Sequence, residues 1–252
     1  MPRKGFNDHL RVNKRHWDAI AKRDRTKKAD MLRQIRDDTP YLEKWEPKLG
    51  PYLKHIKGKK IIVPQFGDGL VMLACAKKGA IVTGVDLSSE QVRSARKAAE
   101  YCGVNVELVE ADWQNLPESI PNDRFDLVVT ECGIFIWIND LDAWMKNAYR
   151  VLRNRGKLVV TDFHPFSIIT EQVKGEIVVK KSYFDQGHGI ENLLSEENEP
   201  PAIEFLWKLS DIINAAINAG FRIDRVEEFY VQPKVRWIRL VPTDFLIAAT
   251  KE

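Results

Sequence analysis

The chain has 252 residues, of which 44% are hydrophobic and 30% are charged, as in ordinary globular proteins. No apolar run approaches the roughly 18 residues of a membrane span, and the first residues show no signal-peptide pattern, so we expect a cytoplasmic protein with no membrane contact. Three scattered cysteines argue against a disulfide framework, and no Cys or His pair has zinc spacing, so no metal site is predicted.

The charge is distributed unevenly along the chain. Residues 1–60 carry 18 Lys and Arg against 8 Asp and Glu, whereas the remainder carries 21 against 28. A basic segment can bind nucleic acid, but here acidic residues alternate with the basic ones, as in the solvated face of helices. We favour the helical interpretation and expect no nucleic-acid partner.

The first segment of the chain reads as helical. Apolar residues recur at helical spacing over 10–37 and 41–56, with a break at Thr39-Pro40. We therefore predict two N-terminal helices and a helical lid over residues 1–57.

From residue 58 the pattern changes to short apolar runs that alternate with amphipathic stretches. Predicted strands cover 60–64, 81–85, 105–109, 125–131, 157–163, 223–231 and 244–250; predicted helices cover 69–78, 89–102, 140–152 and 204–219. Strands that are apolar nearly throughout are typical of a parallel sheet covered on both faces. The prediction is an α/β, Rossmann-like, doubly wound and mostly parallel seven-stranded sheet over residues 58–252.

An irregular stretch interrupts this alternation after the fifth strand. Residues 164–207 are too long for an ordinary connection. We therefore predict an insertion there that covers the substrate. Its aromatic residues and histidine, as candidates for an acceptor pocket, are Tyr183, Phe184, His188, Phe205 and Trp207.

A glycine-containing turn follows the first predicted strand. In "QFGDG", Gly67 and Gly69 allow the backbone to approach a ligand closely, and Asp86 ends the next strand, where a carboxylate can bind both ribose hydroxyls. A dinucleotide loop needs a third glycine where this chain has Met72, which weakens a nicotinamide or flavin interpretation.

Polar residues also follow the third and fourth strands. Asp112 can accept a hydrogen bond from an exocyclic amine, and Trp113 can stack on a base. Glu131 ends the fourth strand at the mouth of the expected cleft. Asp86 and Asp112 could instead cap helices and Trp113 could be core, but together these three residues predict a nucleoside-type cofactor.

The motifs "GVDLS", "VEADWQNLP" and "RFDLVVTECGIFIWINDLDAWMKNAYRVLRNRGKLVVTDFHP" make residues 58–163 resemble a class I S-adenosylmethionine-dependent methyltransferase, of the bacterial small-molecule type. The resemblance implies S-adenosyl-L-methionine as the cofactor, with Asp86 at the ribose and Asp112 and Trp113 at the adenine. The cofactor-binding residues that it implies are Trp17, Gln65, Phe66, Gly67, Gly69, Asp86, Leu87, Asp112, Trp113 and Glu131.

The sequence departs from this family at two positions. Val63 stands where most members have an acid, and Gln65 stands where most have a glycine. Because Gly67, Gly69, Asp86 and Asp112 remain, and because an amide can bind either an ammonium or a carboxylate, we interpret the site as functional.

Methyl transfer needs a base only if the acceptor is protonated. His164, directly after the fifth strand, is the predicted proton acceptor, although it could instead only shape the turn before Pro165. Glu131 is the second catalytic candidate, and it could bind either an acceptor amine or the cofactor's ammonium group.

Three functions follow from these patterns. The first is O- or N-methylation of a small-molecule acceptor, by a monomer or homodimer. The second is methylation of RNA or protein, motivated by the basic N-terminal segment. The third is a domain that binds the cofactor without catalysis, motivated by Val63 and Gln65.

Overall fold

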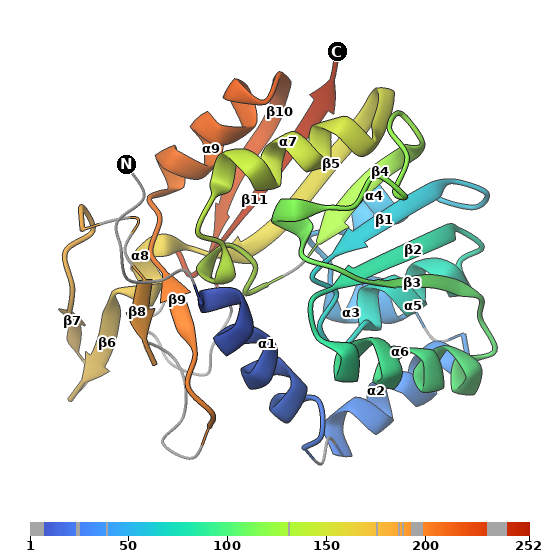
Figure 1. Ribbon diagram of the computed structural model, residues 1–252, viewed down its shortest axis with the longest axis horizontal. Helices are drawn as coiled ribbons and strands as arrows, with labels where there is room; N and C mark the ends of the chain where they lie inside the picture. Colours follow the sequence, from blue (N-terminus) through green and yellow to red (C-terminus); the bar gives the residue numbers. More distant parts are fainter. Residues whose placement is uncertain are drawn as a thin grey trace.

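The computed structural model describes residues 8–23, 26–38, 40–130, 132–174, 176–185, 187, 189–192, 199–230 and 241–252. Its centre is a seven-stranded sheet in the order β10-β11-β5-β4-β1-β2-β3 (Figure 1). The strands are β1 (Lys60–Pro64), β2 (Ile81–Asp86), β3 (Val106–Glu110), β4 (Phe125–Thr130), β5 (Leu152–Phe163), β10 (Phe221–Phe229) and β11 (Asp244–Lys251). Only β11 runs antiparallel to its neighbours, which confirms the predicted Rossmann-like, mostly parallel sheet.

Helices cover both faces of the sheet, as its nearly continuous apolar strands require. They are α2 (Thr26–Arg36), α5 (Leu70–Lys77) and α6 (Ser89–Cys102) on one face, and α7 (Leu141–Val151) and α9 (Leu209–Asn218) on the other. Each face has its own buried cluster, with Met72 in one and Trp144 in the other. The two layers hold the carboxyl ends of β1, β2 and β4 at one edge, beside α1 (His9–Ile20) (Figure 1).

The N-terminal helices are shorter than predicted. The first predicted helix is two helices, α1 and α2, because α1 packs against α6 and β9 whereas α2 packs against α5 and α6. The second is also divided, into α3 (Tyr41–Trp45) and α4 (Gly50–Leu53). Pro47 explains this break, since the residue before a proline avoids helical backbone and Glu46 has φ −125° and ψ 55°.

The segment after β5 contains more regular structure than the sequence indicates. It holds α8 (Pro165–Ile168) and two small antiparallel sheets, formed by β6 (Thr170–Val173) with β7 (Glu176–Val179) and by β8 (Gly189–Glu191) with β9 (Ile203–Phe205). The prediction of a helix from residue 204 was therefore wrong at its start, because this stretch pairs with β8 and α9 begins only at Leu209. None of the described helices is both long and apolar enough to span a membrane.

Candidate functional site

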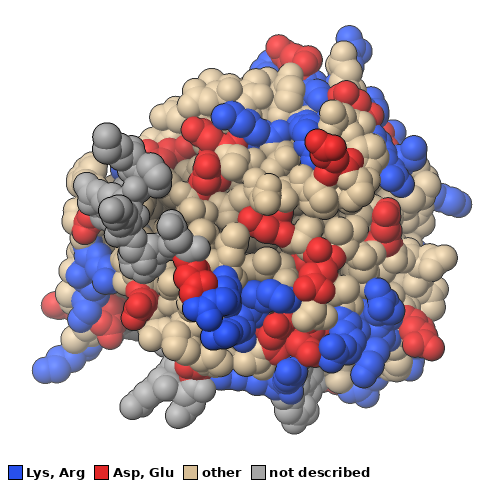
Figure 2. All heavy atoms as spheres, in the orientation of Figure 1, with Lys and Arg blue, Asp and Glu red and all other residues tan. Residues whose placement is uncertain are grey.

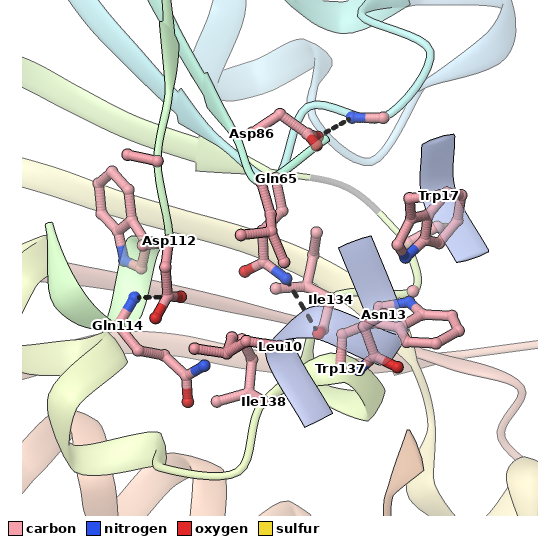
Figure 3. Close-up of a pocket in the computed structure, with 16 residues that line it drawn as sticks. Leu10, Asn13, Trp17, Gln65, Asp86, Asp112, Gln114, Ile134, Trp137 and Ile138 are labelled. Atoms are coloured by element: carbon pink, nitrogen blue, oxygen red, sulfur yellow. Dashed lines mark hydrogen bonds between the residues drawn. The ribbon is translucent and has the colours of Figure 1, made fainter. Parts of the chain in front are cut away.

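A pocket with about 690 Å³ of empty space, part of it open to solvent, lies where β1 to β4 end. Its walls are the glycine turn after β1, the ends of β2 and β3, the loop after β4, and one side of α1. Figure 3 shows Gln65 near the middle of this pocket, with Asp112 and Gln114 on one side and Trp17 and Trp137 on the other. The position agrees with the general rule that open α/β sheets bind ligands beyond the carboxyl ends of their strands.

Only part of the glycine turn lines the pocket. Gly67 has φ +52°, lines the pocket, and a Cβ built there would meet nothing within 4 Å. Gly69 has φ +73°, but its Cβ would lie 3.1 Å from the Met72 side chain, inside the protein. Phe66 is buried and packs over Gly84. Of the glycine pair, only Gly67 borders the pocket, while Phe66 and Gly69 support the turn from behind.

Asp86 ends β2 and is buried with 8% of its surface exposed. Its carboxylate accepts one hydrogen bond from Gly67 N–H at 3.0 Å and another from Ser88 N–H at 2.9 Å. Burial raises the pKa of Asp86 to about 6, although the two N–H groups act in the opposite direction. Because a carboxylate has about four acceptor sites, Asp86 can fix the turn and still accept two further hydrogen bonds from a ligand.

Asp112 and Trp113 begin the short helix η1 (Trp113–Asn115). Asp112 lines the pocket, and its carboxylate accepts Gln114 N–H at 3.0 Å, as an N-cap does. Trp113 is 2% exposed, and its Nε1–H donates to the Trp144 carbonyl at 3.1 Å. Trp113 therefore contributes to the core as well as to the pocket wall.

The loop after β4 is fixed by hydrogen bonds to a buried acid that the sequence did not indicate. Asp162, near the end of β5, accepts the N–H groups of Ile134 at 3.0 Å and Phe135 at 2.8 Å, and also those of Gly133 and Phe163. Burial raises the pKa of Asp162 to about 6, against the effect of these four N–H groups. Ile134 and the nearby Trp137 line the pocket, so Asp162 determines where this wall lies.

Helix α1 is attached to the ends of two strands. On the β2 side, Lys14 Nζ donates to the Leu87 carbonyl at 3.1 Å, and Asp18 accepts the Ser88 hydroxyl at 2.6 Å. On the β9 side, the Asn13 amide both donates to and accepts from the backbone of Ile203, each at 2.8 Å.

The aromatic residues of this region close the pocket at α1. Trp17 lines it, and its ring lies 5.1 Å from that of Trp137 in a T-shaped arrangement. His16 is buried behind them, and its Nδ1 lies 2.7 Å from the Pro200 carbonyl. Because a carbonyl only accepts, Nδ1 must carry the proton.

His164 lies outside the pocket. Its Nδ1 accepts Phe166 N–H at 3.1 Å and so caps α8, while its Nε2 lies 2.9 Å from the Glu228 carboxylate. Burial lowers the pKa of His164, although Glu228 acts in the opposite direction. In the neutral ring the proton is on Nε2, beside the Glu228 carboxylate, and the lone pair of Nδ1 accepts Phe166 N–H, so no lone pair is free for a substrate proton. This geometry favours a structural role for His164.

The other predicted residues do not all lie at the pocket. Leu87 lines the pocket beside Asp86. Glu131 and His188 lie outside the described residues. Tyr183 accepts Leu209 N–H, and Trp207 donates to the Ile138 carbonyl, so both engage the segments around α9 and the pocket wall. No cluster of metal ligands occurs in the described part of the chain.

Sequence reasoning missed several pocket residues. They are Leu10, Asn13, Ala111, Gln114, Ile134, Trp137 and Ile138. A signal existed for Gln114 and Trp137, which follow the third and fourth strands at the expected ligand edge. Leu10 and Asn13 carry no such signal, because only the packing of α1 brings them to the pocket.

This sheet order and pocket define a Rossmann-like protein of the methyltransferase class. Residues 65–156 match the family model described as "Methyltransferase domain". The chain is 35% identical over 176 residues to the uncharacterized methyltransferase YbaJ of Bacillus subtilis strain 168, covering 66% of this chain and 67% of that protein. It is 33% identical over 103 residues to a ubiquinone biosynthesis O-methyltransferase of Coxiella burnetii, covering 41% and 43% of the two chains.

The solved structures agree with this class. An S-adenosylmethionine-dependent methyltransferase from Mesorhizobium loti matches with a TM-score of 0.67 and 21% identity, covering 81% of this chain and 97% of that one. The protein therefore belongs to the S-adenosylmethionine-dependent methyltransferases, and S-adenosylmethionine is its cofactor.

Proposed function

We propose that this methyltransferase acts on a small-molecule acceptor, at oxygen or nitrogen. The observation that carries this proposal is the attachment of α1 across the pocket, with Lys14 and Asp18 at one strand end and Asn13 at another. A concave pocket bordered by α1 in this way, lined mostly by apolar side chains with a few polar groups, has the character of small-molecule sites. It admits a cofactor and a compact acceptor more readily than a polymer.

The residues of the pocket fit the cofactor by their chemistry. We assign the ribose hydroxyls to the carboxylate of Asp86 and the adenine amine to Asp112, since both are acceptors with remaining capacity. Gly67 offers the space that a close backbone approach needs. Leu87 and Trp17 supply apolar walls, and Trp113, Phe66 and Gly69 keep these walls in shape.

The cofactor supplies an activated methyl group on a positively charged sulfur. The protein's task is to orient the acceptor and to exclude water. The described lining residues include no histidine or lysine, and His164 lies outside the pocket. We therefore assign catalysis mainly to positioning within the closed pocket, with Glu131 kept as a candidate ligand for an acceptor amine or the cofactor's ammonium group.

The names of relatives support a small acceptor. The similar proteins include ubiquinone biosynthesis O-methyltransferases and a demethylmenaquinone methyltransferase from Thermus thermophilus, which is 37% identical over 99 residues. These names refer to demethylmenaquinone and to ubiquinone biosynthesis. For this chain they support a planar, largely apolar acceptor, in keeping with the indole rings of Trp17 and Trp137 at the pocket.

The distribution of charge gives less support to an RNA acceptor. Basic residues of the N-terminal helices meet acids, as in the contacts Arg11–Asp8, Arg33–Asp30 and Lys22–Glu90. Figure 2 shows Lys and Arg interspersed with Asp and Glu over the face it presents, without a continuous basic surface. A phosphate backbone is bound through accumulated positive charge, which such pairing reduces.

A transfer assay tests this proposal. The protein is incubated with S-adenosylmethionine carrying a tritiated methyl group and a cell extract, which is then divided into small-molecule and macromolecular fractions. We expect label in the small-molecule fraction, and less of it with the Asp86→Ala variant. Label confined to RNA or protein would refute the small acceptor, and cofactor binding without any transfer would favour a non-catalytic domain.

A further inference from the structure

The side-chain amide of Gln65 has a fixed orientation. Trp144 is fully buried, and its Nε1–H donates to Oε1 of Gln65 at 2.7 Å. An indole N–H can only donate, so the oxygen of this amide must face Trp144 and its nitrogen must face the other way. Rotation of the amide would place two donors together and leave the buried indole N–H without an acceptor, which proteins avoid.

The nitrogen of the same amide points toward the pocket. One N–H of Gln65 Nε2 is directed at the Ile134 carbonyl, at 3.5 Å, as the dashed line in Figure 3 shows. The group has two hydrogens, and within the described residues no second acceptor contacts it. Gln65 lines the pocket and is only partly buried. The ligand space therefore faces a hydrogen-bond donor at this position and not an acceptor.

The charges of the pocket make this donor important. Asp86 and Asp112 supply acceptors at the end assigned to the nucleoside. Neither lysine nor arginine occurs among the described residues that line the pocket. Val63 is buried at 3% exposure and offers no charge to an ammonium group. Among the described residues, an anionic part of a ligand can therefore be bound here only by neutral N–H donors.

From this geometry we propose that Gln65 binds the carboxylate at the amino-acid end of S-adenosylmethionine through Nε2, and that it does not bind the ammonium group. The inference rests on the cofactor site proposed above. Trp144 acts as the positioning residue, because its N–H prevents the amide from presenting its oxygen. A residue that replaces glycine in related loops thus adds one directed contact to the cofactor.

Two ligands and one variant test this assignment by calorimetric titration. S-adenosylhomocysteine carries both the amine and the carboxylate, whereas decarboxylated S-adenosylhomocysteine carries only the amine. The variant Gln65→Glu keeps the size and the acceptor for Trp144 but replaces the donor by a carboxylate. A hydrogen bond to a charged group corresponds to about tenfold to hundredfold in affinity. We expect the parent to prefer S-adenosylhomocysteine by that factor and Gln65→Glu to lose this preference.

5′-Methylthioadenosine, which has no amino-acid end, is the control ligand, and it should bind parent and variant equally. Equal affinity of the parent for S-adenosylhomocysteine and its decarboxylated form would overturn the assignment, whether or not the variant folds. So would a variant that weakens both ligands by the same factor. If the parent binds none of the three nucleosides, the cofactor site itself is wrong, which is a different failure from that of Gln65.

Discussion

The backbone of Ile134 is held on both sides by two side chains from different strand ends. Its N–H donates to the buried carboxylate of Asp162 at 3.0 Å, and its carbonyl faces Gln65 Nε2 at 3.5 Å. The loop after β4 is thereby fixed between the ends of β5 and β1. This loop forms one wall of the cofactor pocket, so its position depends on a residue that does not line the pocket.

Replacing Asp162 should destabilise the protein. In Asp162→Ala the N–H groups of Gly133, Ile134 and Phe135 lose their acceptor, and each buried unpaired group costs about 1–3 kcal/mol. We expect the free energy of unfolding to fall by at least about 3 kcal/mol in urea denaturation. The exposed Asp142→Ala is the control and should change it by less than about 1 kcal/mol. Equal stability of the two variants would contradict this role.

Cofactor affinity should depend on the ionisation of Asp86. Ribose hydroxyls donate to the ionised carboxylate, whose pKa lies at about 6 in the free protein because of burial. Below that pH a proton must leave before binding. We expect affinity for S-adenosylhomocysteine to fall about fivefold from pH 6 to pH 5 and to level off above pH 7. In Asp86→Asn, calorimetry should show weaker binding without this decline; a persisting decline would assign it to another group.

The same shifts affect the stability of the free protein. Asp86 and Asp162 both have pKa values raised to about 6 by burial, above the ordinary value of 3.8. Between these values the native protein binds more protons than the unfolded chain, so this contribution to stability is present below about pH 4 and is lost as the pH rises through 6. Saturating S-adenosylhomocysteine should reduce the loss of stability that Asp86 causes as the pH rises. It should leave the loss that Asp162 causes unchanged.

Gly67 and Gly69 form a matched pair for separating binding from packing. Both have positive φ, so alanine at either position carries a similar backbone cost of about 1–2 kcal/mol. At Gly67 the methyl group enters open pocket space, whereas at Gly69 it meets Met72 at 3.1 Å. We expect Gly67→Ala to weaken cofactor binding more and Gly69→Ala to lower stability more. The reverse order, measured by titration and thermal unfolding, would refute this placement of the turn.

Local sequence patterns were sufficient for the sheet and for one side of the site. Short apolar runs are buried on both faces only in a parallel sheet, so β1 to β4 followed from periodicity alone. The positions of Gly67 and Asp86 followed as well, because a glycine turn and a strand-end acid come together wherever two parallel neighbours end at the same edge.

The remaining features depend on contacts between distant segments. Asn13 and Ile203 are 190 residues apart, and nothing in either local sequence indicates that they pair. Glu204 and Phe205 of β9 were mistaken for the start of a helix, because a strand of three residues is too short to show an alternating pattern and only its pairing with β8 makes it a strand. The orientation of Gln65 likewise depends on Trp144, which reaches it from a helix 79 residues later.

The attachment of α1 to β9 should control how quickly the cofactor leaves. Asn13→Ala removes two hydrogen bonds and leaves the backbone N–H and carbonyl of Ile203 unpaired. We expect faster dissociation of S-adenosylhomocysteine in stopped-flow measurements, by roughly tenfold if about 1.4 kcal/mol is lost from the closed state. Arg11→Ala, on the exposed side of the same helix, is the control. If both variants release the ligand at the parent rate, α1 does not limit its exit.

His164 provides the last test, because sequence position and geometry disagree about it. Its Nδ1 accepts Phe166 N–H and so caps α8. Because Asn is also a good N-cap, we expect His164→Asn to fold. Loss of the contact with Glu228 should lower its free energy of unfolding by only about 1 kcal/mol. The methyl-transfer rate per folded molecule should stay near that of the parent.

Because burial lowers the pKa of His164, the native protein binds fewer protons than the unfolded chain just below pH 6.5, and stability should decline there as the pH falls. The Asn variant should lack this decline. A folded variant whose transfer rate drops a hundredfold, with unchanged cofactor affinity, would instead restore His164 as the proton acceptor.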